Sequence, residues 1–302
     1  MAEFKAGTCS WKYDSWRGLV YTDNPEINYL KEYSKIFNYV EIDQWFQSLR
    51  GVNNIDLPRT EIAKGFKESV PYDFKFSVKV PNSITLTHFC KTEKDEPIIQ
   101  NQHFLSLDIL SEFIGLIKPI HKNLGPLIFQ FEYLTKEMMK SQFEFQGLFR
   151  EFSGKLPEGF LYAVETRNPN YLNDAYFQFL KDNKLGHVFL HGYFMPPIYD
   201  IYKKYKDYIK NYTVIRLHGP DQKGMEQRTG GMWNKIIEPR NEELEKIISM
   251  ILELLDRKVD VYLNVNNHYE GSAPLTILRI QKMMSQIKQG SSHESLINNN
   301  NI

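Results

Sequence analysis

Short apolar segments alternate with longer amphipathic segments along the whole chain. Eight apolar segments, rich in Phe, Val, Ile, Leu and Tyr, predict β-strands at roughly 4–9, 39–42, 73–79, 125–130, 160–165, 187–190, 212–217 and 259–265. Apolar residues recurring at helical spacing predict helices at roughly 27–37, 58–69, 103–121, 137–152, 172–184, 199–210, 241–257 and 274–288. Each predicted strand is therefore followed by a predicted helix.

This order predicts a single α/β domain, a TIM-like (β/α)8 barrel over residues 1–289. A doubly wound open sheet is the alternative. It favours a Gly-rich turn after the first strand when it holds a nucleotide, whereas Cys9 to Tyr13 contains neither GxGxxG nor a P-loop. Residues 290–302 are rich in Ser and Asn and predict a disordered tail. Two long polar connections, 80–102 and 218–240, are expected on the C-terminal face of the barrel.

Composition narrows the functional classes. The 302 residues carry a formal net charge of +0, which argues against nucleic-acid binding mainly by phosphate neutralisation. The 2 Cys form no CxxC pair, so neither a disulfide framework nor a cysteine-based zinc site is indicated. We see no signal peptide and no apolar run of the ~18 residues that a membrane span needs. We therefore expect a cytoplasmic protein without a membrane partner.

Polar side chains gather where the predicted strands end. They are Ser10 and Trp11; Glu41, Asp43 and Gln44; Lys79; Gln130; Glu165 and Arg167; His191; Arg216 and His218; and Asn264, Asn266, Asn267 and His268. In a barrel of this type the C-terminal strand ends form one rim, and this rim carries the active site. The sequence therefore predicts a polar site at this face.

The segment from Tyr262 to Pro274 gives this prediction its clearest local form. An apolar strand ends in Asn266, Asn267 and His268, and a helix start follows at Ser272. Polar side chains beside the free N–H groups of a helix start suit an anion or a small polar ligand.

Charged residues two apart on one strand point the same way, as Glu165 and Arg167 do, and as Arg216 and His218 do. A carboxylate held by arginine stays ionised and can position a substrate or accept a proton. Arginine that is left unpaired suits a phosphate or carboxylate. The alternative is that Glu165 and the arginines form a buried ion pair that closes the top of the barrel.

Lys79 also has two interpretations. A lysine inside a barrel can form a Schiff base if desolvation lowers its pKa. The favoured interpretation is that Lys79 is a charge partner for Glu41 or Glu165, because no second feature supports an aldolase.

A divalent metal is an alternative cofactor. His191, His218 and His268 end three successive strands and could join Glu41 or Glu165 as ligands. No HxH or HExxH spacing supports this set, and we favour histidines that bond backbone carbonyls or carboxylates instead.

Six blocks of sequence resemble the domain of unknown function 72 (YecE-like) family, nearly from end to end. They begin with Gly7-Thr8-Cys9-Ser10-Trp11-Lys12-Tyr13-Asp14-Ser15-Trp16-Arg17-Gly18, which is similar to the family's G-T-S-G-W-x-Y-x-x-W-x-G. The others are Val40-Glu41-Ile42-Asp43-Gln44-Trp45-Phe46, Phe76-Ser77-Val78-Lys79-Val80-Pro81, Val164-Glu165-Thr166-Arg167, Arg216-Leu217-His218-Gly219 and Asn266-Asn267-His268-Tyr269-Glu270-Gly271-Ser272-Ala273-Pro274.

The resemblance implies a TIM-barrel-like fold and supplies no reaction. Similarity to endonuclease IV and xylose isomerase barrels is an analogy only. The chain departs from the family pattern at two places. Gln130-Phe131-Glu132-Tyr133 stands where the family often has Q-x-P-P, and His191-Gly192 stands where many members carry an acid.

The first functional hypothesis is an enzyme or sensor for a small phosphorylated or carboxylated compound, for example a hydrolase, lyase or isomerase. Its catalytic candidates are Glu165, His218 and Glu41. Its ligand-binding candidates are Trp11, Lys79, Arg167, Arg216, Asn266, Asn267, His268 and Ser272.

The alternatives are a nucleic-acid-binding or repair barrel and a non-catalytic interaction protein. In the first, Trp11, Trp16, Trp45 and Phe46 would stack bases. In the second, the polar groups at the strand ends pair with one another and leave no pocket.

Overall fold

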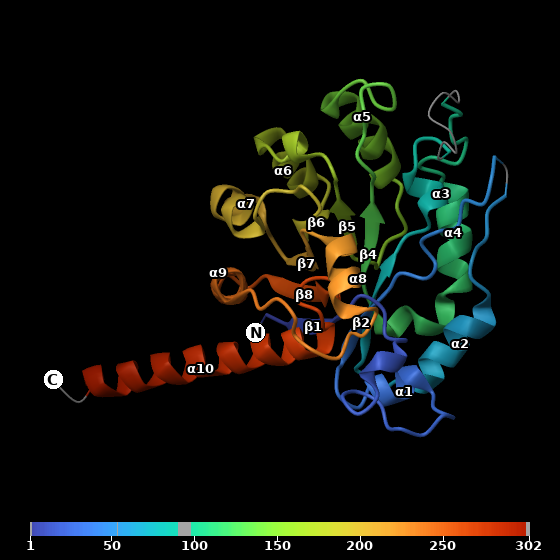
Figure 1. Cartoon of the computed structure of the whole chain (residues 1–302). Helices are drawn as coiled ribbons and strands as arrows, with labels where there is room; N and C mark the ends of the chain where they lie inside the picture. The colour runs from blue at the N-terminus through green and yellow to red at the C-terminus, as the bar shows by residue number, and fades with distance from the viewer. Residues whose placement is uncertain (1, 53, 90–97, 300–302) are drawn as a thin grey trace.

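Eight parallel strands form a nearly closed barrel (Figure 1), as the sequence predicts. The computed structural model describes residues 2–52, 54–89 and 98–299. The strands are β1 (Phe4–Thr8), β2 (Tyr39–Ile42), β3 (Lys75–Lys79), β4 (Leu124–Gln130), β5 (Tyr162–Glu165), β6 (Gly186–Gly192), β7 (Tyr212–Gly219) and β8 (Asp260–Val265). Hydrogen-bonded neighbours run β1-β8-β7-β6-β5-β4-β3-β2. Between β1 and β2 the Ser10 N–H donates to the Glu41 carbonyl at 3.1 Å, which brings the two ends of the sheet together.

Helices surround the sheet, and each predicted helix has a counterpart (Figure 1). They are α1 (Tyr29–Tyr33), α2 (Thr60–Ser69), α4 (Leu107–Leu116), α5 (Gln142–Ser153), α6 (Asp174–Asp182), α7 (Ile198–Tyr205), α9 (Asn241–Asp256) and α10 (Ala273–Asn299). Side-chain oxygens of Asn28, Ser106, Ser141 and Asn173 cap four of them at the N-terminus. None of the described helices has an apolar stretch long enough to cross a membrane.

Two short helices lie in the long connections that the sequence predicts as polar loops. They are α3 (Asn82–Thr85) and α8 (Gln222–Thr229), and residues 90–97 of the first connection lie outside the described part of the chain. Asp221 caps α8 by accepting from the Gly224 N–H. The last helix, α10, is assigned as far as Asn299, and residues 300–302 lie outside the described range. The disordered tail at 290–302 stays a prediction.

The strands are buried on both faces, as parallel strands covered by helices must be. One apolar cluster comprises Tyr39, Ile128, Ala163, Val188, Tyr212, Val214 and Tyr262. Side chains two apart on a strand share a face, so the residues two further along point the same way. Four of those residues are Glu41, Gln130, Glu165 and Arg216. The barrel interior is thus apolar at one level and polar at the next level toward the C-terminal ends.

Gly7 marks the closest approach between β1 and β2. A Cβ placed there would lie 2.0 Å from the Tyr39 carbonyl oxygen. The Tyr33 hydroxyl bridges the same strands, because it donates to the Tyr39 carbonyl and accepts from the Thr8 N–H, both at 3.0 Å. The ring can close here only because residue 7 has no side chain.

We therefore predict that Gly7→Ala lowers the free energy of unfolding by about 1–3 kcal/mol, because the added methyl group forces β1 away from β2. Gly65 is the control, because it lies within α2 and a Cβ there meets nothing within 4 Å. Gly65→Ala should raise stability by about 0.5–1 kcal/mol, since Gly is disfavoured inside helices. Urea unfolding measures both. Equal stability of Gly7→Ala and the native chain would contradict the close approach.

Candidate functional site

One arginine connects three strands inside the C-terminal end of the barrel. Arg216 of β7 donates from Nε and Nη2 to the two carboxylate oxygens of Glu41 on β2, at 2.9 and 2.6 Å. Its Nη1 donates to Glu165 Oε2 of β5 at 2.5 Å and to Gln130 Oε1 of β4 at 3.2 Å. Arg216 is 2% exposed, and both carboxylates are fully buried. We call Arg216, Glu41 and Glu165 the arginine clamp.

Glu165 has a second cationic partner. Arg167 Nε donates to Glu165 Oε1 at 2.8 Å, and Arg167 Nη2 lies 2.7 Å from the same oxygen as an ion pair. Burial by itself would raise the pKa of Glu165, but Arg216 and Arg167 together outweigh burial and lower that pKa from 4.5 to about 2. In the described part of the chain Glu41 forms its ion pair with Arg216. Burial raises its pKa above 4.5, because the charges of Arg216 and Lys79 compensate burial incompletely.

Lys79 of β3 faces the same interior. It is 9% exposed, and its Nζ lies 3.7 Å from the centre of the Phe46 ring, a cation–π contact. Burial, assisted by repulsion from Arg216, lowers the pKa of Lys79 from 10.5 to about 8. Attraction by Glu41 and Glu165 opposes this shift, as expected of the charge partner that the sequence analysis favours.

His218 lies on the next inward position of β7 after Arg216. Its Nδ1 is 2.9 Å from the Tyr193 hydroxyl, and its Nε2 is 3.9 Å from Cys9 Sγ. Burial, together with the charges of Arg216 and Arg167, holds the pKa of His218 well below 6.5, so the imidazole is neutral at pH 7. Burial likewise raises the pKa of the Cys9 thiol, which makes a thiolate nucleophile there unfavourable.

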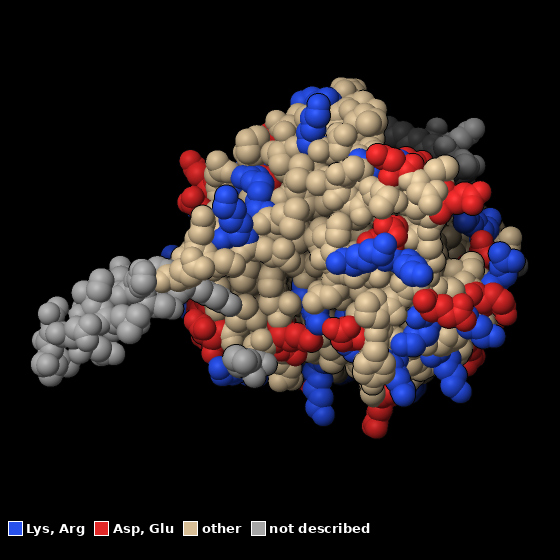
Figure 2. All heavy atoms as spheres, turned by 90° about the horizontal axis from the view of Figure 1, so that it is seen from below, with Lys and Arg blue, Asp and Glu red and all other residues tan. Residues whose placement is uncertain are grey.

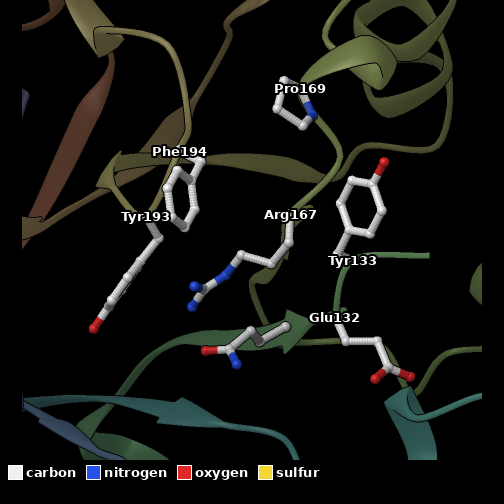
Figure 3. Close-up of a pocket in the computed structure, with 7 residues that line it drawn as sticks. Glu132, Tyr133, Arg167, Pro169, Tyr193 and Phe194 are labelled. Carbon is white, nitrogen blue, oxygen red and sulfur yellow. The ribbon is translucent and has the colours of Figure 1, made fainter. Parts of the chain in front are cut away.

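A cavity of about 600 Å³ opens beside the clamp (Figure 3), within the 300–1,000 Å³ typical of ligand sites. Its lining comes from the polypeptide after β4, β5 and β6 and consists of Gln130, Glu132, Tyr133, Arg167, Pro169, Tyr193 and Phe194. Arg167 belongs both to this lining and to the pair with Glu165. The Arg167 side chain is 21% exposed, and its guanidinium lies over the Tyr193 ring, 4.8 Å from the ring centre.

Glu132 is a cavity residue that the sequence analysis noticed as a departure from the family pattern but did not assign to the site. Burial raises its pKa from 4.5 to about 7, and its Oε1 lies 3.6 Å from His88 Nδ1. Glu132 follows Gln130 by two positions, so continuing the strand alternation would have directed attention to it. The aromatic residues Tyr133, Tyr193 and Phe194 lie in loops and carry no comparable periodic signal.

The predicted site residues thus divide into two groups. The structure brings Glu41, Lys79, Glu165, Arg167, Arg216 and His218 together at the C-terminal end of the barrel. Because Arg216 is almost fully buried among these groups, direct contact between Arg216 and an anion would require neighbouring side chains to move. The assignment of Arg216 as a ligand-binding residue stays a prediction, as do the catalytic roles of Glu165, His218 and Glu41.

The second group, Asn266, Asn267, His268, Ser272 and Trp11, is engaged in local structure. Asn266 Oδ1 accepts from the His268 N–H at 3.0 Å, and Asn267 Oδ1 accepts from the Ala273 N–H at 2.9 Å. His268 Nε2 lies 3.1 Å from Glu226 Oε1 of α8. Trp11 packs edge-on against Phe66, and Ser272 is fully buried. No ligand role is assigned to them by this geometry, so these roles also stay predictions.

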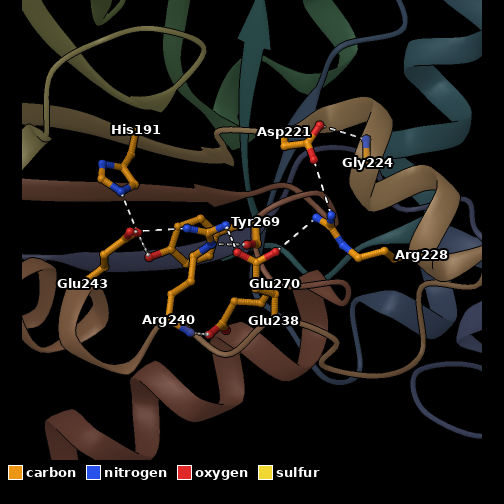
Figure 4. A network of polar contacts seen from close by, with 9 residues as sticks. All are labelled: His191, Asp221, Gly224, Arg228, Glu238, Arg240, Glu243, Tyr269 and Glu270. Carbon is orange, nitrogen blue, oxygen red and sulfur yellow. Dashed lines mark hydrogen bonds and ion pairs between the residues drawn. The ribbon is translucent and has the colours of Figure 1, made fainter.

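The three histidines of the alternative metal site have separate partners. His191 Nε2 lies 2.8 Å from Glu243 Oε2 of α9 (Figure 4). His218 faces Tyr193, and His268 faces Glu226. In the described part of the chain no three His, Cys, Asp or Glu side chains are grouped closely enough to hold a metal ion.

Comparison with known proteins places the chain among proteins of the same architecture. The family model described as "Protein of unknown function DUF72" matches residues 5–298. A solved DUF72 family protein from Thermotoga maritima is 21% identical, covers 94% of this chain and 99% of its own, and superposes with a TM-score of 0.64. A DUF72 family protein from Enterococcus faecalis is 19% identical, with coverages of 94% and 98% and a TM-score of 0.60. No curated protein matches the chain.

Loss of the clamp arginine should be costly. We predict that Arg216→Leu lowers the free energy of unfolding by about 3–5 kcal/mol, because two buried carboxylates lose their main counter-charge. Arg228 is the matched control, because it bridges Asp221 and Glu238 at the surface (Figure 4). Arg228→Leu should cost about 0–1 kcal/mol in the same denaturation experiment. Similar losses in the two variants would show that the clamp does not stabilise the barrel.

Lys79 should make the free energy of unfolding depend on pH in the alkaline range. The folded protein releases the Lys79 proton near pH 8, whereas the unfolded chain retains it until about 10.5. Between these values the unfolded state binds more protons, so the free energy of unfolding gains up to about 3 kcal/mol from this group as pH rises.

Unfolding of the native chain and Lys79→Met, measured from pH 7.5 to 10.5, tests this expectation. The stability difference between them should change with pH as Lys79 titrates, while the surface variant Lys64→Met should follow the native profile. A constant difference between Lys79→Met and the native chain would show that the Lys79 pKa is not lowered.

Proposed function

Because the chain belongs to the family of unknown function DUF72, in agreement with the resemblance in its sequence, we propose its function from its own site: it binds a small phosphorylated or carboxylated compound at the C-terminal face of the barrel. The site of binding is the cavity that Arg167 shares with the loops after β4, β5 and β6. Similarity to the two solved relatives supports the fold alone and adds nothing to this choice.

The observation that carries the proposal is the state of Arg167. A guanidinium has five N–H donors in a planar fork. Glu165 Oε1 accepts from Nε of Arg167 and forms an ion pair with Nη2, and within the described residues Nη1 makes no hydrogen bond. Figure 3 shows the guanidinium in the cavity, beside the Tyr193 ring. Donors therefore remain for an anion, and the pairing with Glu165 holds them in place before the ligand arrives.

The clamp supports this role from beneath. Glu165 contacts Arg167 through Oε1 and Arg216 through Oε2, so two arginines share the neutralisation of that carboxylate. If Arg167 were the only cation paired with Glu165, an anion that bound Arg167 would compete with a buried carboxylate for its one counter-charge. Arg216 relieves this competition and leaves Arg167 free to attract a second negative group.

We propose binding in preference to a specific reaction. With a pKa of about 2, Glu165 is a weak proton acceptor at neutral pH. Glu132, with a pKa of about 7, is the cavity residue better matched to proton transfer. A hydrolase, lyase or isomerase reaction is compatible with this arrangement, and the geometry of the cavity does not choose among them.

The alternatives gain less support. Trp11, Trp16 and Trp45 are buried, which leaves their faces little room to stack bases, and the half-buried ring of Phe46 contacts Lys79. Figure 2 shows positive and negative side chains interspersed over one face of the molecule. The hypothesis of a non-catalytic interaction protein agrees with the charge pairing within the clamp, but it does not explain the cavity beside Arg167.

We predict that Arg167→Gln weakens binding of inorganic phosphate or citrate about tenfold or more, because a charge-assisted contact is lost. Isothermal titration at low ionic strength measures the affinity, and circular dichroism verifies that the variant is folded. Arg150→Gln on the outer helix α5 removes the same charge outside the cavity and should leave affinity unchanged. Absence of binding to the native chain, or equal binding by Arg167→Gln, would refute the proposal.

A further inference from the structure

The loop after β6 holds two aromatic residues in an unfavourable backbone conformation. Gly192, Tyr193 and Phe194 have successive φ values of 126°, 53° and 64°. The left-handed region is disfavoured for bulky L-residues and persists where surrounding structure imposes it. Such strain is often found at ligand sites, and here it lies at the rim of the Arg167 cavity.

The surroundings that impose this conformation can be identified. Gly192 lies so close to β7 that a Cβ would be 2.2 Å from the Gly219 carbonyl oxygen. Tyr193 is held from two sides, by His218 through its hydroxyl and by Arg167 across its ring. Because Tyr193 is anchored inward, the next residue in the loop projects outward. Phe194 is 100% exposed although it lines the cavity.

A second exposed aromatic ring faces this cavity from another loop. Tyr133, which follows β4, is 57% exposed. In Figure 3 Phe194 and Tyr133 lie on opposite sides of Arg167, with Pro169 beyond them. A single exposed aromatic residue needs no explanation. Two such rings around a fixed guanidinium, on the edge of one cavity, form a site with apolar walls and one cationic anchor.

We propose that the ligand of this cavity is an organic anion that carries a flat ring, with its phosphate or carboxylate on Arg167 and its ring between Tyr133 and Phe194. This inference rests on the proposed function and specifies the class of ligand. The cavity of about 600 Å³ is much larger than an inorganic anion needs. Aryl phosphates, nucleoside monophosphates and aromatic carboxylates share the required chemistry, and aromatic walls favour a flat ring over a saturated one.

The test compares three ligands that share one anionic group: inorganic phosphate, cyclohexyl phosphate and phenyl phosphate. Isothermal titration of the full chain should show that phenyl phosphate binds more tightly than cyclohexyl phosphate, and both more tightly than inorganic phosphate. Adenosine monophosphate and benzoate extend the series; tight binding of either supports the proposal and identifies the natural source as nucleotide or aromatic acid.

Variants of Phe194 and Tyr133 test whether these two side chains cause the preference for a flat ring. Phe194→Asn, chosen because Asn tolerates positive φ, should weaken phenyl phosphate about threefold to tenfold and leave inorganic phosphate unchanged. Tyr133→Ala should do the same. Phe143 is the matched control, since it is 84% exposed in α5 but does not line the cavity. Phe143→Asn should change no affinity.

The outcomes separate this inference from the proposed function. Equal affinities for the three phosphates, all dependent on Arg167, would overturn the flat-ring ligand and leave anion binding intact. Binding of none of them would overturn both. Unchanged affinities in Phe194→Asn together with an altered sedimentation coefficient would assign Phe194 to contacts between copies of this chain, and would also overturn the inference.

Discussion

The contact between Arg216 and two buried glutamates is the constraint on which the upper half of the barrel depends. Arg216 meets Glu41 through two hydrogen bonds and Glu165 through a third, all without solvent. Removing three charges from water is costly, and their mutual attraction compensates only when the geometry is good. The strands that carry them must therefore keep a fixed stagger. An ion cluster of this kind specifies the register of β2, β5 and β7 as much as it stabilises them.

The same cluster controls the electrostatics of the neighbouring groups. The charge of Arg216 lowers the pKa of Glu165 against the opposing effect of burial, and it adds to burial in lowering the pKa of Lys79 and His218. Its effect reaches the cavity through Glu165, whose other oxygen orients Arg167. The result is two levels: a closed lower level of paired charges and an upper level where one arginine retains free donors. The proposed ligand site lies at the upper level, where Arg167 is paired with Glu165 and also lines the cavity.

The segment after β8 shows how a polar cluster can serve structure instead. Its amides and imidazole looked suited to an anion, but in the folded chain they bond to nearby backbone groups and to α8. Asn267 satisfies the N–H of Ala273 at the start of α10, and Asn266 satisfies that of His268. Short polar side chains readily bond to backbone groups a few residues away. Such local partners are always available, whereas a ligand must compete for the same atoms.

The amino-acid sequence by itself determined the number and order of strands, the barrel, and the gathering of Glu41, Glu165 and Arg216 at the ends of their strands. These features follow from alternation and helical spacing, which are local properties of the chain. Only the tertiary structure decided that Arg216 is buried and paired with Glu41 and Glu165, while Arg167 retains N–H donors that face the cavity. That division depends on strand stagger and on burial, and both arise when distant segments close into a ring. For the same reason the walls formed by Tyr133 and Phe194 could not be predicted, because loop conformations follow from the contacts they make and carry no period of their own.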